Sequence, residues 1–190
     1  MMGAYKDFLE KRQTLIMVYH DVAKKFKDLN VQDVTIKYAP DMDDYAVLSP
    51  YGEDEKRKKP TLFVGHLMFN LDKEEIEAVI AHELGHYVRI KNYSWEKFKK
   101  QSDWSQEIGD YTSHMLKDEA VKHRVKRLQN WYFLIESYAD KQAADKGYAK
   151  HIVSSIKKIN RWHEKEMPLL AKRNDAKRIK SLEKILKEKR

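Results

Sequence analysis

The segment that most constrains the fold is His-Glu-Leu-Gly-His at residues 82–86, in which two histidines lie four positions apart. On an α-helix, residues at this spacing share one face, one turn above the other. The imidazoles of His82 and His86 can then converge on one ion at the roughly 2.0–2.1 Å that zinc–nitrogen bonds require. Glu83 points beside that face, where it can reach a water activated by the metal. The segment therefore predicts a helix that carries a zinc site suited to amide hydrolysis.

The residues before this segment carry the signals of a helix start. Asp72 can act as the N-cap, Glu75 occupies the position of a capping-box partner, and the first turn is acidic. Apolar residues then recur at helical spacing, at Ile76, Val79, Ile80 and Leu84. We therefore predict a helix from Glu74 to about Lys91, with one apolar side that anchors it.

A third metal ligand is needed, because catalytic zinc usually takes three protein ligands and a water. Glu136 follows the apolar run 131–135 within a predicted buried helix from Asp118 to Lys146. A buried carboxylate is costly unless it is paired or bound to a metal. Asp140 lies one turn later, where it can accept the N–H of a ligand histidine. The alternative interpretation is an ordinary half-buried helix with two solvated acids.

These segments resemble the gluzincins, whose third ligand is a glutamate on a downstream helix with an aspartate four residues later. More closely, they resemble the HtpX and CAAX prenyl protease family of zinc endopeptidases. The matching segments are 61–65, 74–86, 136–140 and Arg178-Ile179. The resemblance implies one zinc ion per chain, held by His82, His86 and Glu136. It also implies that Glu83 is the general base, that Asp140 orients a ligand histidine, and that Arg178 supports the site.

The resemblance further implies a substrate-binding edge strand directly before the zinc helix. The matching strand is 61–64, and its candidate contact residues are Leu62, Phe63, Val64 and Gly65. An extended peptide could pair along such a strand by strand addition. The alternative is a plain strand of the sheet without a role in binding.

The chain departs from the family pattern at two points. Most members have membrane-spanning helices, whereas the longest apolar runs here, 15–19 and 131–135, fall far short of the ~18–20 residues that span a bilayer. The chain is therefore closest to the small soluble members called minigluzincins. The family also tends to place a histidine, as a transition-state stabiliser, six residues before the terminal arginine, where this chain has Lys172.

Composition narrows the location and the class of protein. The chain has no cysteine, which excludes disulfides and thiolate ligands, and its N-terminus lacks the apolar core of a signal peptide. We therefore expect a cytoplasmic protein. The net charge of +8 is also compatible with nucleic-acid binding. Because acids alternate with the lysines and no nucleic-acid motif accompanies them, we do not expect a nucleic-acid partner.

The expected fold class is α+β, mostly helical and zincin-like, with a small three-stranded sheet next to the zinc helix. We expect one zinc metallopeptidase domain over 1–190, made of an N-terminal helix in 1–30, a zincin core in 31–147 and C-terminal helices in 148–190. Besides the two site helices, the predicted elements are a helix at 5–29, strands at 33–38, 46–49 and 61–64, and helices on either side of Pro168.

The predicted function is zinc-dependent endopeptidase activity on a peptide or unfolded protein. One alternative is a latent or inactive zinc-protease scaffold whose cleft is covered by its C-terminal helix. In that helix Ile179, Leu182, Ile185 and Leu186 form the buried side. The other alternative is a basic nucleic-acid-binding protein, which salt-dependent binding to DNA or RNA would reveal.

Overall fold

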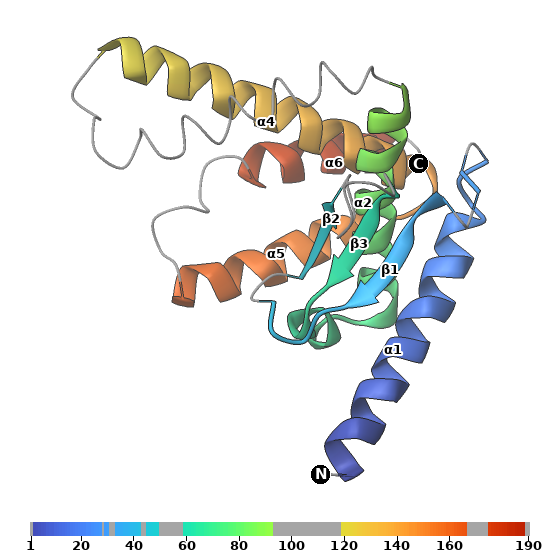
Figure 1. The fold of residues 1–190 in the computed structure, drawn as a ribbon. Helices are drawn as coiled ribbons and strands as arrows, with labels where there is room; N and C mark the ends of the chain where they lie inside the picture. Colours follow the sequence, from blue (N-terminus) through green and yellow to red (C-terminus); the bar gives the residue numbers. More distant parts are fainter. Residues whose placement is uncertain are drawn as a thin grey trace.

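The computed structural model of the chain describes residues 2–27, 29–30, 33–42, 45–49, 59–92, 119–166 and 175–188. Pro168 and Lys172, which entered the sequence analysis, lie outside these ranges. The elements are helix α1 (Met2–Ala23), strands β1 (Thr35–Tyr38), β2 (Ala46–Ser49) and β3 (Thr61–Val64), a 3₁₀-helix (His66–Asn70), and helices α2 (Lys73–Asn92), α4 (Glu119–Asp145), α5 (Ala149–Glu166) and α6 (Asp175–Glu188). This is a mostly helical α+β fold with a three-stranded sheet, as predicted (Figure 1).

The sheet has the strand order β1-β3-β2, with β3 parallel to β1 and antiparallel to β2. The predicted edge strand, with Leu62, Phe63, Val64 and Gly65, is therefore central, and that prediction is wrong. Leu62 pairs with Ile36 on one side and with Leu48 on the other. The unbroken apolar run of β3 suits a strand that neighbours cover, and most of its side chains are buried. The strand next to the site is β2.

Helix α2 lies against the sheet and also packs on α1, α4 and α5 (Figure 1). At its start, the Asp72 N–H donates to the Glu75 carboxylate over 2.9 Å, which is one half of the predicted capping box. The apolar side predicted from the sequence is buried, with Ile76, Val79, Ile80 and Leu84 all in the core. The helix that carries the two histidines is therefore held on one side by packing.

Helix α1 ends at Ala23, six residues earlier than predicted. The N–H groups of Lys25 and Phe26 bond to carbonyls three residues back, on Val22 and Ala23, and this tighter spacing ends the α-helix. Phe26 is still only 3% exposed, because the turn directs it into the core. Phe26 is therefore buried from a turn after α1, and not from within the predicted helix 5–29.

Helix α4 ends at Asp145, one residue before the predicted end at Lys146. Gly147 has a positive φ of 94°, a conformation that favours glycine. The N–H of Tyr148 donates to the Ala143 carbonyl and that of Gly147 to the Ala144 carbonyl, which is a Schellman motif. The chain can therefore reverse at once into α5, which returns alongside α2 and α4.

Helix α6 is part of the same hydrophobic core. Leu182 is 1% exposed, and the other predicted inward residues, Ile179, Ile185 and Leu186, pack against the core as partly buried side chains. The apolar side predicted for this helix is thus confirmed. Within the described residues, none of the helices combines the length and apolar character needed to cross a membrane.

Candidate metal centre

Three side chains from two helices converge beside the sheet. His82 and His86 of α2 bring their Nε2 atoms to 3.0 Å from each other. The Glu136 carboxylate of α4 lies 3.2 Å from the first of these atoms and 3.4 Å from the second. Within the described part of the chain, this is the only group of three or more histidine or acidic residues whose ligand atoms all lie within 4.8 Å of one another. These residues could hold a metal ion.

The spacing and the chemistry of this group fit zinc. Ligand atoms around a tetrahedral zinc ion, each roughly 2.0–2.1 Å from it, lie about 3.3 Å apart. Two imidazole nitrogens and a carboxylate oxygen form a common ligand set for catalytic zinc. Asp140 Oδ1 lies 2.8 Å from His82 Nδ1, which leaves Nε2 as the ring nitrogen that could bind a metal ion.

The close contact of α2 with α4 depends on Gly85, within the His-Glu-Leu-Gly-His segment. A Cβ atom at this position would lie 2.8 Å from the Ala139 carbonyl oxygen and 2.9 Å from its Cα. The two helix backbones can therefore approach only because residue 85 has no side chain. We predicted no role for Gly85 from the sequence, although glycine inside a helix costs up to about 1 kcal/mol and usually has a packing reason.

Arg178 links helix α6 to both carboxylates of α4. Its guanidinium makes a bidentate pair with Asp140, from Nε over 2.8 Å and from Nη2 over 2.9 Å. Its Nη1 lies 3.0 Å from Glu136 Oε2 and 3.5 Å from Asp175 Oδ1. The structure thus brings Arg178 to the predicted site, where it contacts carboxylates that belong to the candidate metal centre.

The carboxylates determine the electrostatics of the cluster. Burial lowers the pKa of His82, but hydrogen bonds to Asp140 and Glu136 outweigh it and raise the pKa to about 10. Burial raises the pKa of Glu136, yet its hydrogen bonds with the two histidines hold that pKa well below its usual value. The carboxylates of the cluster therefore favour the protonated, positively charged form of His82. Because a metal binds the neutral imidazole, a proton and a metal ion compete for His82.

Glu83 lies beside the ligands, in position to act on a bound molecule. Burial raises the pKa of its carboxyl group, although the nearby histidines oppose the shift. Its Oε2 accepts a hydrogen bond from the Leu48 N–H of β2 over 3.1 Å. The edge of β2 therefore faces Glu83. The sequence had predicted that β3 would occupy this position in the sheet.

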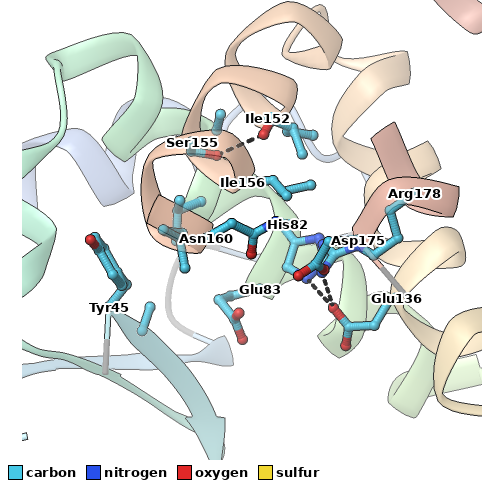
Figure 2. A pocket seen from close by; sticks show the side chains of 14 residues that line it. Tyr45, His82, Glu83, Glu136, Ile152, Ser155, Ile156, Asn160, Asp175 and Arg178 are labelled. Atoms are coloured by element: carbon cyan, nitrogen blue, oxygen red, sulfur yellow. Dashed lines mark hydrogen bonds and ion pairs between the residues drawn. The ribbon is translucent and has the colours of Figure 1, made fainter. Parts of the chain in front are cut away.

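A cavity of about 260 Å³ opens beside these residues (Figure 2). Figure 2 shows Glu136, Asp175 and Arg178 on one side of it and residues of α5 on another. The lining residues are Tyr45 and Ala46 before and in β2, Ala78, Val79, His82 and Glu83 of α2, Glu136 of α4, Ile152, Ser155, Ile156, Ile159 and Asn160 of α5, and Asp175 and Arg178 of α6. No residue from β3 lines this cavity. We predicted no role for the residues of α5 from the sequence.

Comparisons with known proteins agree with this geometry. The model of Peptidase family M48 matches residues 10–94, a span that includes α2 with both histidines and Glu83 and ends before Glu136. Searches of the curated proteins and of the solved structures found no match. Metallopeptidases of this family are metal-dependent, which accords with the converged ligand group. Over residues 10–94, this chain is similar to peptidase family M48.

Proposed function

We propose that this protein is a zinc-dependent endopeptidase that hydrolyses peptide bonds in peptides or unfolded proteins. The observation that carries the proposal is the convergence of His82, His86 and Glu136, with ligand atoms within 4.8 Å of one another, next to Glu83 in one cavity. The match to a metallopeptidase family over the helix with both histidines supports it. His82, His86 and Glu136 would hold the zinc ion, with Asp140 and Arg178 as the residues that orient them.

Glu83 is the residue to which we assign proton transfer. A bound zinc ion supplies Lewis acidity, which polarises a carbonyl group and lowers the pKa of water. In the proposed reaction, the Glu83 carboxylate accepts the proton of the attacking water and then delivers it to the leaving amine. Its burial supports this role, because a carboxyl group with a raised pKa holds and returns a proton closer to neutral pH.

The peptide would lie along β2 rather than along the predicted β3. On one side β2 pairs with β3, and within the described residues no strand pairs with its other side. The Leu48 N–H points from that side to Glu83. An extended peptide paired with this edge would therefore pass next to the general base and the metal ligands.

The test separates metal binding from chemistry. Glu83→Gln should keep the fold and the zinc but lose hydrolysis of an unfolded protein such as casein, because an amide cannot accept the proton. Glu74→Gln, at an exposed position on the same helix, is the matched control and should behave like the wild type. A chelator should abolish wild-type hydrolysis, and added zinc should restore it. Wild-type turnover by Glu83→Gln would remove Glu83 as the base.

The alternative of a latent enzyme concerns α6, which contributes two residues to the cavity. Arg178 pairs with Asp140, and Leu182 is buried in the core, so removal of α6 would take away support from the site and from the fold. We therefore expect a chain shortened before Asp175 to melt at a lower temperature and to gain no activity. Higher casein hydrolysis by the shortened chain would instead favour latency.

A further inference from the structure

The positive charge of the chain is concentrated at its C-terminal end. Residues 146–190 contain 15 lysine and arginine residues but only 5 aspartate and glutamate residues. Residues 1–145 contain 23 basic and 25 acidic residues, so they carry no excess of positive charge. The net charge of +8 therefore comes from the segment that contains α5 and α6. Such an asymmetry favours binding of this segment to an anionic partner.

On α6 the lysines lie opposite the buried side. Four exposed lysines follow the spacing i, i+3, i+7, i+10, which is that of a single helix face. They are Lys177, Lys180, Lys184 and Lys187. Leu182 lies on the opposite side of the helix and is 1% exposed. The lysines therefore point away from the core, and the packing of the apolar side holds the helix in this orientation.

Helix α5 extends this charged surface. Its exposed charged residues also share one face, at the spacing i, i+7, i+11. They are Lys150, Lys157 and Arg161. The Lys157 ammonium lies 3.5 Å from the Glu183 carboxylate of α6, so the exposed sides of the two helices adjoin. We call these three residues of α5 and the four lysines of α6 the basic face.

Acidic side chains neutralise the basic face only weakly. Over residues 149–161 and 175–188, the exposed acidic residues are Glu183 and Glu188. Glu183 pairs with Lys157 over 3.5 Å, and Glu188 pairs with Lys184 over 3.7 Å. In both pairs each side chain is at least 49% exposed, so water and salt compete for the charges. The lysines can therefore exchange these partners for other anions at little cost.

We propose that the basic face of α5 and α6 binds the surface of a lipid bilayer that contains anionic phospholipids. Six of its seven residues are lysines, which an anionic bilayer attracts as point charges. Arginine, which recognises bases and phosphates through paired hydrogen bonds, occurs once. Residues 149–161 and 175–188 include no phenylalanine, tyrosine or tryptophan on which nucleic-acid bases could stack. This composition favours a bilayer over a nucleic acid.

The basic face lies on the side of α5 that is turned away from the cavity. Ile152 and Ile156, on the other side of this helix, line the cavity. Binding to a bilayer therefore leaves the candidate metal ligands uncovered by the basic face itself. It does not depend on the proposed function, because neither the lysines nor the lipids take part in hydrolysis.

Vesicle sedimentation tests the proposed binding. The full-length protein is mixed with vesicles of phosphatidylcholine, either alone or with phosphatidylserine as about a third of the lipid. We expect binding only to the vesicles that contain phosphatidylserine. High salt should release the protein, because the Debye length falls from about 10 Å at 0.1 M to about 3 Å at 1 M. Equal binding to both compositions, or binding that salt does not weaken, would overturn the proposal.

Substitutions then locate the surface. Lys180→Gln/Lys187→Gln removes two charges from exposed positions of the basic face, where the fold should tolerate the change. Each lysine near an anionic bilayer contributes about fivefold in affinity, so this variant should bind roughly 25-fold more weakly. Arg12→Gln/Lys24→Gln is the matched control, because it removes the same charge from exposed positions of α1. In Figure 1, α1 lies to the right of the sheet and α5 to its left.

The control separates a defined surface from a general effect of net charge. Arg12→Gln/Lys24→Gln should bind phosphatidylserine vesicles within about twofold of the wild type. An equal loss of affinity in both double variants would overturn the basic face. Titration of a labelled DNA duplex at the same salt concentration tests the other anionic partner. Binding to DNA without binding to phosphatidylserine vesicles would also overturn the proposal. None of these outcomes depends on whether the protein hydrolyses casein.

Discussion

Helix α2 carries two clusters of buried charge about two turns apart, one at Glu75 and one at His82. The Glu75 side chain, with the residue 2% exposed, accepts hydrogen bonds from the Asp72 N–H over 2.9 Å, the Ser154 hydroxyl over 2.6 Å and the Lys158 ammonium over 2.7 Å. Its charge is therefore matched by groups of the chain itself. This cluster joins the start of α2 to α5.

The cluster at His82 has a different charge balance. Glu136 and Asp140 share the single guanidinium of Arg178, and Glu83 and Asp175 line the same cavity. Acidic groups therefore outnumber the permanent positive charges, and the raised pKa of His82 reflects this surplus. A divalent cation would balance it. The comparison indicates that the first cluster serves stability, whereas the second has the charge balance of a site that could hold a metal ion. The predictions below test that difference, beginning with the largest expected effect.

Loss of the third ligand should have the largest effect. Glu136→Ala removes the only carboxylate in the ligand group, so zinc affinity should fall by more than the roughly 100-fold upper limit for loss of a supporting residue. Peptide hydrolysis should disappear with it. Competition with a chromogenic chelator measures the affinity. Unchanged zinc affinity in this variant would mean that Glu136 is not a ligand.

Loss of the Asp140 charge should lower zinc affinity by a smaller factor. Asp140→Asn keeps the shape of the side chain but removes the charge that faces His82 and Arg178. Zinc affinity should fall by roughly 10–100-fold, as expected when a residue that positions a ligand is changed. The same chelator competition provides the measurement. A larger loss in Asp140→Asn than in Glu136→Ala would reverse the roles assigned to the two residues.

The contact between α2 and α4 should be sensitive to the volume of the side chain at position 85. Gly85→Ala introduces a Cβ within 3 Å of the Ala139 backbone, so the helices must separate. We expect the free energy of unfolding to fall by about 1–3 kcal/mol. Zinc should also bind more weakly, since His82 and Glu136 come from different helices. Denaturant titration of the metal-free protein measures the first effect, and an unchanged midpoint would show that the helices adapt without cost.

The cluster at Glu75 should affect stability alone. Glu75→Gln should lower the free energy of unfolding by about 1 kcal/mol near pH 7, because charged hydrogen bonds become neutral ones. Burial raises the Glu75 pKa, but Lys158 and Ser154 outweigh it and lower the pKa below its usual value. The ionised carboxylate therefore stabilises the fold above pH 4.5, and this contribution is lost as the pH falls through the folded-state pKa.

Two measurements check the Glu75 prediction. Denaturant titrations at several pH values should show the difference between wild type and Glu75→Gln shrinking in acid. Zinc affinity should be the same in both proteins, with Glu74→Gln as the exposed control. A large loss of zinc affinity in Glu75→Gln would break the distinction between the two clusters.

Local patterns explain which features could be predicted from the sequence. The spacing of His82 and His86 on a helix, and the start of that helix at Asp72 and Glu75, depend on residues within one or two turns. The predicted end of the next helix at Lys146 is equally local, because Gly147 follows it with a positive φ. These predictions agree with the structure because neighbouring residues determine the geometry.

Contacts between distant segments account for what was missed. The strand order cannot be read from the strands one by one, and only the unbroken apolar run of β3 hinted at a central position. The pairing of Arg178 with Asp140 spans 38 residues, and the family resemblance indicated only that Arg178 supports the site. The residues of α5 that line the cavity follow helical spacing in the sequence, yet the same spacing also describes an ordinary core helix. Only the tertiary structure shows that these residues lie beside the candidate metal ligands.

The most direct test of the metal centre is the zinc content of the purified protein, measured by mass spectrometry after incubation with zinc and removal of the excess. The wild type should retain one zinc ion per chain, because two histidines and a carboxylate converge at the spacing that zinc requires. His82→Ala/His86→Ala should retain none. Full zinc occupancy in this double variant, or a wild-type protein that retains no zinc, would contradict the account.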